Sequence, residues 1–108
     1  MHFDDVMNTV HTWLTEISEK YKNKISIEIM NDNNSSFIVN FETERFIAQL
    51  TVNDGGFQPF RFVEFHVLDS GKSVNQPPAY LYHDNDESTK DEIINNLNDC
   101  INFISGSV

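Results

Sequence analysis

The sequence predicts a single α+β domain, residues 1–108, with an N-terminal helix, a four- to five-stranded antiparallel meander sheet and a C-terminal helix. Apolar residues recur every three or four positions near both ends of the chain, and they alternate with polar residues through its middle. Clusters of Asn, Asp and Gly separate the alternating stretches. Strands grouped between two helices favour a sheet with both helices packed on one face.

Composition is typical of one packed domain. A chain of 108 residues should bury roughly 65% of its unfolded surface. The chain contains nine Phe but only four Gly and three Pro. This composition excludes disordered and fibrous proteins. No apolar run approaches the ~20 residues that span a bilayer, and the first residues carry Asp4 and Asp5 where a signal peptide would carry Lys or Arg. We therefore expect a cytoplasmic protein without membrane contact.

The first element is a helix over residues 4–22. Its apolar residues lie at three- and four-residue intervals and would form one buried stripe: Val6, Met7, Val10, Trp13, Leu14, Ile17 and Tyr21. Asp4 and Asp5 lie at its start, where the helix dipole favours anions. Three lysines lie near its end, where the dipole favours cations: Lys20, Lys22 and Lys24. Charge and periodicity thus predict the same element.

Three strands should follow. Residues 24–30 alternate Ile with polar residues, which predicts a half-buried strand, and residues 31–35 are Asn, Asp and Ser, which predicts a turn. The second strand is centred on Phe37, Val39 and Phe41. A turn at 43–44 then leads into a third strand over residues 45–52.

The fourth and fifth strands are less regular. A turn at 53–56, with two glycines, precedes a fourth strand over 60–68. One face of that strand is entirely apolar, with Val63, Phe65 and Val67. The other face mixes aromatic residues with Glu64 and His66. A turn at 69–72 and an irregular stretch at 74–78, which contains two prolines, lead to a short edge strand over 79–83.

The last helix should begin near Ser88. Its apolar residues return to helical spacing: Ile93, Ile94, Leu97, Cys100, Ile101 and Ile104. Ser105 and Gly106 end it, with the glycine as the C-terminal cap. At its start, Ser88 with Asp91 and Thr89 with Glu92 have the spacing of a capping box, in which side chains satisfy the unpaired first amides.

The same stretch, YHDNDESTKDE, partly fits the pattern of a calcium-binding loop. Asp84, Asp86 and Ser88 fit the first, third and fifth ligand positions of an EF-hand. The sixth position is Thr89 where glycine is needed, and the twelfth is Asn95 where glutamate is needed. We therefore expect no metal in this loop, and the helix cap explains most of its residues.

The sequence contains no cofactor or catalytic signature, and we expect neither cofactor nor enzymatic activity. The four histidines share no spacing that would bring two onto one face: His2, His11, His66 and His83. Cys100, the single cysteine, lies on an apolar helix side and should be a packing residue. Glu64 and His66 project from one strand face, either as an acid–base pair or as a structural hydrogen-bonded pair.

Seventeen acidic and seven basic residues give a formal charge of −10. This charge would repel the phosphates of nucleic acids and anionic lipids, so neither is an expected partner. It would speed association with a basic protein, or it could serve solubility alone.

From Ser36 to Phe103 the chain resembles the small immunity proteins of bacterial polymorphic-toxin and contact-dependent growth-inhibition systems, in particular the TriTu group. Three stretches carry the resemblance: FIVNFETERFIAQLTVNDGG, FVEFHVLDSGKSV and IINNLNDCINFI. The resemblance implies a protein that binds a cognate toxin domain and blocks it without chemistry.

A toxin that cuts nucleic acid needs a cationic cleft, which an acidic partner could occupy. The residues we expect to contact it are Asp84, Asp86, Glu87 and Asp91, with three acids at hairpin ends as second choice: Glu42, Glu44 and Asp54. An alternative is a small-molecule-binding or regulatory domain that uses the Glu64 and His66 face or the Pro77-Pro78 loop. Catalysis is the third hypothesis.

Overall fold

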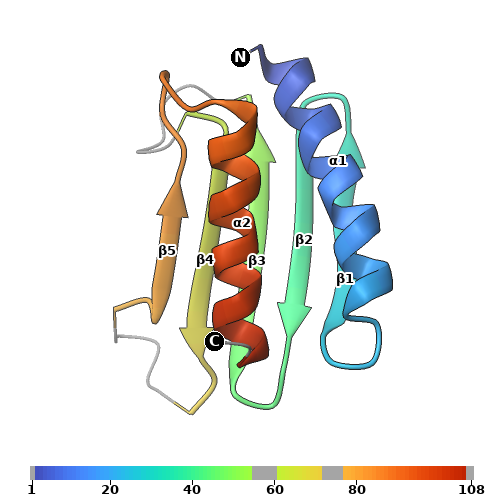
Figure 1. Ribbon diagram of the computed structural model, residues 1–108, viewed down its shortest axis with the longest axis vertical. Coiled ribbons are helices and arrows are strands. Elements are labelled where there is room, and N and C mark those ends of the chain that lie inside the picture. The colour runs from blue at the N-terminus through green and yellow to red at the C-terminus, as the bar shows by residue number, and fades with distance from the viewer. Residues whose placement is uncertain (1, 55–60, 72–76, 107–108) are drawn as a thin grey trace.

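The computed structural model describes residues 2–54, 61–71 and 77–106, and the elements follow the predicted order (Figure 1). They are α1 (Phe3–Lys20), β1 (Ser26–Asn33), β2 (Ser36–Glu42), β3 (Phe46–Asn53), β4 (Val63–Asp69), β5 (Tyr80–His83) and α2 (Lys90–Ser105). The predicted α+β domain is confirmed. Within these described residues, no helix is both long and apolar enough to cross a membrane.

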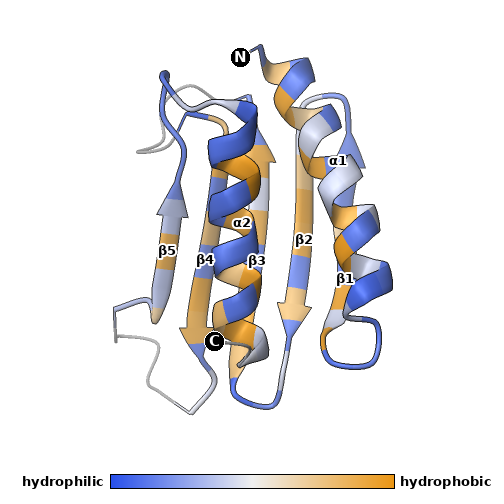
Figure 2. Cartoon of the chain, viewed as in Figure 1, coloured by the Kyte–Doolittle hydropathy of each residue, from blue (hydrophilic) through white to orange (hydrophobic). Residues whose placement is uncertain are grey.

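The strands form one antiparallel sheet in the order β1-β2-β3-β4-β5. Both helices lie on the same face of this sheet (Figure 1). They also run in the same direction, so that both begin at one end of the molecule and finish at the other. Apolar residues follow the strands beneath the helices and the helix sides that face them (Figure 2). The arrangement follows from the alternating pattern, which gives each strand one apolar face to cover.

The core lies between the helices and the sheet. Val39, Leu50 and Phe65 sit directly opposite one another on three neighbouring strands, and all three are fully buried. The fully buried residues of the helices complete this layer: Val6, Val10, Ile93, Leu97, Cys100 and Ile101. Burying each large apolar side chain contributes about 1.5 to 3 kcal/mol, so this layer is the main source of stability.

The two helices are also joined by polar contacts. The indole N–H of Trp13 on α1 donates to Asn98 Oδ1 on α2 at 2.8 Å. One turn further along α2, Asn102 Oδ1 accepts from the hydroxyl of Tyr21, the residue that follows α1, at 3.4 Å. Trp13 and Tyr21 are otherwise buried. These bonds satisfy the polar tips of two core aromatic residues and fix one helix against the other.

The first hairpin differs from its prediction. Residues 31–33 were expected to lie in the turn, but β1 continues to Asn33 and the turn contains only Asn34 and Ser35. A bulge at Met30 shifts the register, so that Asp32 lies opposite Phe37. The Asn33 side chain then accepts a bond from the Ser35 amide at 3.0 Å. Asn and Asp bond well in turns, and here that preference masked the extension of the strand.

The other boundaries agree with prediction within a few residues. The C-terminal cap of α2 is confirmed, since Gly106 has a φ of 74°. Parts of three predictions lie outside the described residues: the glycines of the turn at 53–56, the start of the fourth strand at Phe60, and most of the stretch 72–78.

Candidate functional site

The topology gathers acidic residues at one end of the molecule. Both helices begin at this end, and the connections β1–β2, β3–β4 and β5–α2 also lie there (Figure 1). Nine of the acidic residues lie in these segments: Asp4, Asp5, Asp32, Asp54, Asp84, Asp86, Glu87, Asp91 and Glu92. Only Arg61 and Lys90 supply positive charge to the same described segments. We call this the acidic end.

The opposite end is nearly neutral. Its described segments contain four acidic residues, Glu19, Glu42, Glu44 and Asp69, and four basic residues, Lys20, Lys22, Lys24 and Arg45. Two ion pairs form among them, Lys22 with Glu19 at 3.3 Å and Arg45 with Asp69 at 3.2 Å. The ends are separated along the longest dimension of the molecule, 36 Å. The structure thus divides the predicted contact residues, because Glu42 and Glu44 lie away from the other five.

Asp84 was predicted as an exposed docking acid, and this prediction is wrong. Only 3% of Asp84 is exposed. Its Oδ1 accepts hydrogen bonds from the backbone amides of Phe62 and Val63, both at 2.8 Å. The carboxylate therefore replaces missing ladder bonds at the start of β4 and is not available to a partner.

The loop after Asp84 is a tight turn that exposes its acids. The Asn85 side chain accepts from the Glu87 amide at 2.8 Å, and the Ser88 hydroxyl accepts from the Asn85 amide at 3.0 Å. These bonds hold the backbone so that Asp86 and Glu87 project into solvent. Asp86 pairs with the Arg61 side chain at 3.1 Å, although it is itself 84% exposed. The loop thus holds Asp86 and Glu87 in fixed positions on the surface, and Arg61 is the only basic side chain paired with either of them among the described residues.

The predicted cap at the start of α2 is confirmed for Thr89 with Glu92 but not for Ser88 with Asp91. Thr89 is the N-cap residue, and its hydroxyl accepts from the Glu92 amide at 3.2 Å and contacts Glu92 Oε1 at 3.3 Å. Ser88 closes the preceding turn instead. Asp91 is exposed and forms no ion pair with a described residue. It thus joins Glu87 and Asp54 as an exposed acid of the acidic end.

Glu64 and His66 do share the uncovered face of the sheet, but they are not the pair that forms. Glu64 Oε2 lies 2.9 Å from His83 Nε2, directly across the β4–β5 ladder. His66 lies opposite Gln49 and Leu81. Both partners of the Glu64–His83 pair are about one quarter exposed. The pair fastens the short edge strand β5 to β4, which is the structural alternative considered for Glu64.

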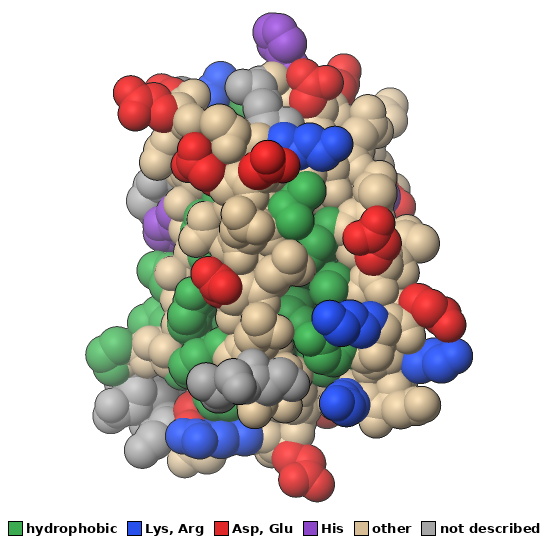
Figure 3. Space-filling model, in the orientation of Figure 1, with side chains coloured by type: hydrophobic (Ala, Val, Ile, Leu, Met, Phe, Trp, Pro, Cys, Tyr) green, Lys and Arg blue, Asp and Glu red, His purple; other side chains and the backbone are tan. Residues whose placement is uncertain are grey.

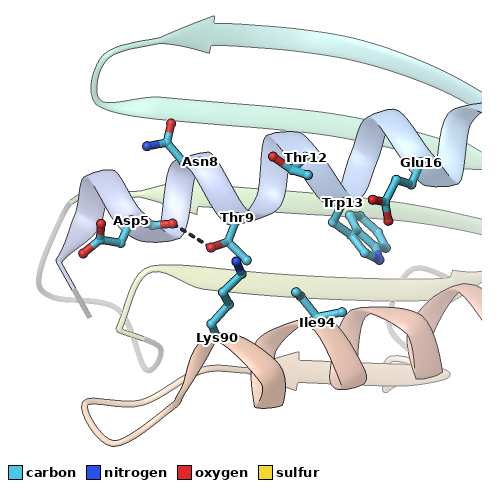
Figure 4. A pocket seen from close by; sticks show the side chains of 8 residues that line it. All are labelled: Asp5, Asn8, Thr9, Thr12, Trp13, Glu16, Lys90 and Ile94. Atoms are coloured by element: carbon cyan, nitrogen blue, oxygen red, sulfur yellow. Dashed lines mark hydrogen bonds between the residues drawn. The ribbon is translucent and has the colours of Figure 1, made fainter.

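A groove of about 500 Å³ runs between α1 and α2 (Figure 4). Six residues of α1 line it, Asp5, Asn8, Thr9, Thr12, Trp13 and Glu16, and two of α2, Lys90 and Ile94. Glu16 points toward Trp13, and Lys90 reaches from α2 toward Thr9. On the helix face as a whole, red acidic side chains outnumber blue basic ones near the acidic end (Figure 3). Sequence analysis missed this groove, because helical periodicity identifies a polar face but not what lies beside it.

Two buried groups near α2 have perturbed acidities. Burial, with a smaller effect from Asp99, raises the pKa of the Cys100 thiol to about 12. Burial, followed by the nearby Asp84 carboxylate, raises the pKa of Tyr82 to about 12. Both groups are therefore neutral at physiological pH. No three His, Cys, Asp or Glu side chains of the described residues are grouped so that they could hold a metal ion.

Comparison of the chain with protein-family models, with curated proteins and with solved structures finds no match. The resemblance to immunity proteins therefore stays a prediction from the sequence, and any functional inference depends on the acidic end and the groove.

Proposed function

We propose that this protein is a cytoplasmic immunity protein that binds a cognate toxin domain and neutralises it without catalysis. The observation that carries the proposal is the separation of charge between the acidic end and the neutral end. The helix N-termini account for Asp4, Asp5, Asp91 and Glu92, and Asp84 is buried, but neither solubility nor helix capping requires Asp32, Asp54, Asp86 and Glu87 at the same end. Concentrated charge supports recognition of a surface of opposite charge.

The partner would be a nuclease-type domain with a basic cleft, because enzymes that act on nucleic acid need positive charge to hold phosphates. The exposed acids Asp54, Glu87 and Asp91 would enter that cleft, with Asp86 exchanging Arg61 for a basic residue of the toxin. Such contacts speed association and weaken as salt is added, because the Debye length falls from about 10 Å at 0.1 M to about 3 Å at 1 M. The same acids would also repel nucleic acid itself.

Co-expression with the toxin encoded next to the gene tests the proposal. We expect the protein to rescue growth, to co-purify with the toxin and to abolish toxin activity at equal molar amounts. Growth arrest that persists at full expression of this protein, with no complex on purification, would contradict it.

A second function, binding of a small molecule, is favoured by the groove between the helices. Its volume of about 500 Å³ lies within the range of ligand sites, about 300 to 1,000 Å³. A defined compound that raises the melting temperature, in a protein that affects no neighbouring toxin, would support this function instead.

A further inference from the structure

Glu16 supplies to the groove between α1 and α2 a negative charge that forms no ion pair among the described residues, and the nearest lysine on its helix, Lys20, lies one turn further on. The Glu16 carboxylate forms no hydrogen bond or ion pair with any described residue, and it points toward the Trp13 ring (Figure 4). Asp5 also lines the groove, eleven residues earlier and so about 16 Å away along the helix axis. Lys90, the one basic residue among those that line the groove, reaches toward Thr9 (Figure 4), and no lysine or arginine lines the groove beside Glu16.

The groove next to Glu16 is suited to an aliphatic chain. The accessible apolar surface comes mainly from Ile94 on α2 and from the methyl group of Thr12 on α1, because Trp13 and Thr9 also line the groove but are only 3% and 7% exposed. Trp13 is held in position because its indole N–H donates to Asn98. An apolar wall that ends at a free carboxylate is complementary to an alkyl stem with a cationic head, since such side chains bury the stem and expose the charge.

We propose that this groove receives a lysine or arginine side chain of the protein partner, with its cationic head on Glu16 and its stem along Ile94 and Thr12. The inference rests on the proposed function. Asp5 and Lys90 line the groove and belong to the acidic end, so the groove opens beside the surface proposed to bind the toxin. A basic surface bound at that end would lie beside the groove opening. Charge complementarity thus selects a basic protein as the occupant.

Small probes test the groove without the toxin. Trp13 lines the groove and is the only tryptophan, so its single indole N–H resonance can be assigned without ambiguity and followed during a titration. Titration with n-butylguanidinium or n-butylammonium should shift this resonance saturably, and n-butanol, which has the stem without the charge, should not. Absence of any saturable shift with both cations, or an equal shift with butanol, would overturn the proposal.

Two matched variants separate a site from a general field. Glu16→Gln and Asp99→Asn each remove one negative charge from an exposed helix position, and Asp99 does not line the groove. We expect Glu16→Gln to weaken binding of butylguanidinium about tenfold, the size expected for one charge-assisted bond. Asp99→Asn should change it less than twofold. Equal losses in the two variants would overturn the proposal.

The toxin assay distinguishes this inference from the proposed function. Loss of toxin affinity in Glu16→Gln, with Asp99→Asn unaffected, would support the inference. Unchanged toxin affinity in Glu16→Gln would overturn it and leave the immunity function intact. Saturable binding of butylguanidinium at Glu16, in a protein that neutralises no toxin, would contradict the immunity function and also the assignment of a partner side chain as the occupant.

Discussion

Asp84 and Val63 are joined by two hydrogen bonds of opposite direction. The Val63 amide donates to the Asp84 side chain at 2.8 Å, and the Asp84 amide donates to the Val63 carbonyl at 3.1 Å. A second amide, that of Phe62, donates to the same carboxylate oxygen. One buried side chain thus completes the pairing of β4 with the end of β5, at the base of the acidic end.

The Asp84→Ala variant should be strongly destabilised. Removing the carboxylate leaves two buried amides without an acceptor, and each unsatisfied group costs about 1 to 3 kcal/mol. We expect the free energy of unfolding, measured by urea denaturation, to fall by about 2 to 6 kcal/mol, which is the sum for the two amides. Asp84→Asn retains a carbonyl acceptor and should lose less. The neighbouring Asp86→Asn, which affects only an exposed ion pair, should stay within ~0.5 kcal/mol of the parent protein. Equal losses in Asp84→Ala and Asp86→Asn would show that the buried bonds are not stabilising.

Charge at the acidic end should control toxin affinity. We expect the double variant Glu87→Gln, Asp91→Asn to weaken binding about tenfold at low salt, mainly through slower association. The matched double variant Glu42→Gln, Glu44→Gln removes the same charge from the neutral end and should have little effect. At physiological salt the Debye length is about 8 Å, whereas the molecule is 36 Å long. Charges at the neutral end are therefore screened from a partner bound at the acidic end.

Association rates measured over a range of salt concentrations check this prediction. The salt dependence should become shallower only when acids of the acidic end are removed. If both double variants weaken binding equally, net charge alone explains the affinity and the acidic end is not a contact surface.

The Cys100 thiol should be unreactive in the folded protein. Its pKa is raised to about 12, chiefly by burial, and only the thiolate is nucleophilic. We expect no measurable alkylation by iodoacetamide at pH 8 under native conditions and complete alkylation in denaturant, as read by mass spectrometry. Rapid labelling of the native protein would contradict both the burial and the packing role.

The helix cap offers a comparison of two adjacent hydroxyls. Thr89→Ala removes the cap of α2 and should destabilise the protein by about 1 kcal/mol. Ser88→Ala removes one bond of an exposed turn and should stay within ~0.5 kcal/mol. Thermal unfolding of the two variants measures the difference. A larger loss for Ser88→Ala would mean that the turn, and not the cap, determines the start of α2.

Most of the fold could be predicted because periodicity reports directly on burial. The alternation in β2 and β4 and the apolar stripes of both helices identified the core positions, and short connections left sequential pairing as the simplest topology. The bulge at Met30 was not predictable in this way. A bulge depends on how two strands meet, and the Asn-rich sequence after it is equally typical of a turn.

The candidate site was predictable only in part. Local sequence identified the exposed acids Asp86, Glu87 and Asp91, but Asp84 looks the same in the sequence and is buried by its position beside Phe62 and Val63. The partner of Glu64 is likewise a residue nineteen positions away, His83. Such contacts depend on the register between strands. The separation of charge into two ends also needs the directions of all the elements, which no local pattern contains.

Tyr82 should make the protein sensitive to alkaline pH. Among the described residues its buried hydroxyl oxygen has no hydrogen-bond partner of normal geometry, and its pKa is raised to about 12 by burial and then by Asp84, against a smaller lowering effect of the nearby Ser88 side chain. The folded state therefore holds this proton more tightly than the unfolded state, whose tyrosine titrates near pH ~10. The resulting stability is complete below about pH 10 and is lost as the pH rises toward 12.

The Tyr82→Phe variant isolates this effect. At pH 7 we expect its stability to stay within ~0.5 kcal/mol of the parent protein, because the buried hydroxyl forms no hydrogen bond of normal geometry and has only a weak interaction with the Ser88 side chain. Between pH 10 and 11.5 its urea midpoint should fall less steeply, since one titrating group is gone. The pKa of Tyr80 is also raised, mainly by burial, but Tyr80 lies nearer the surface. Tyr80→Phe is therefore the control and should change the pH dependence of the urea midpoint less. A Tyr82→Phe protein that is less stable at pH 7 and has the parental alkaline slope would mean that the hydroxyl is hydrogen-bonded in solution.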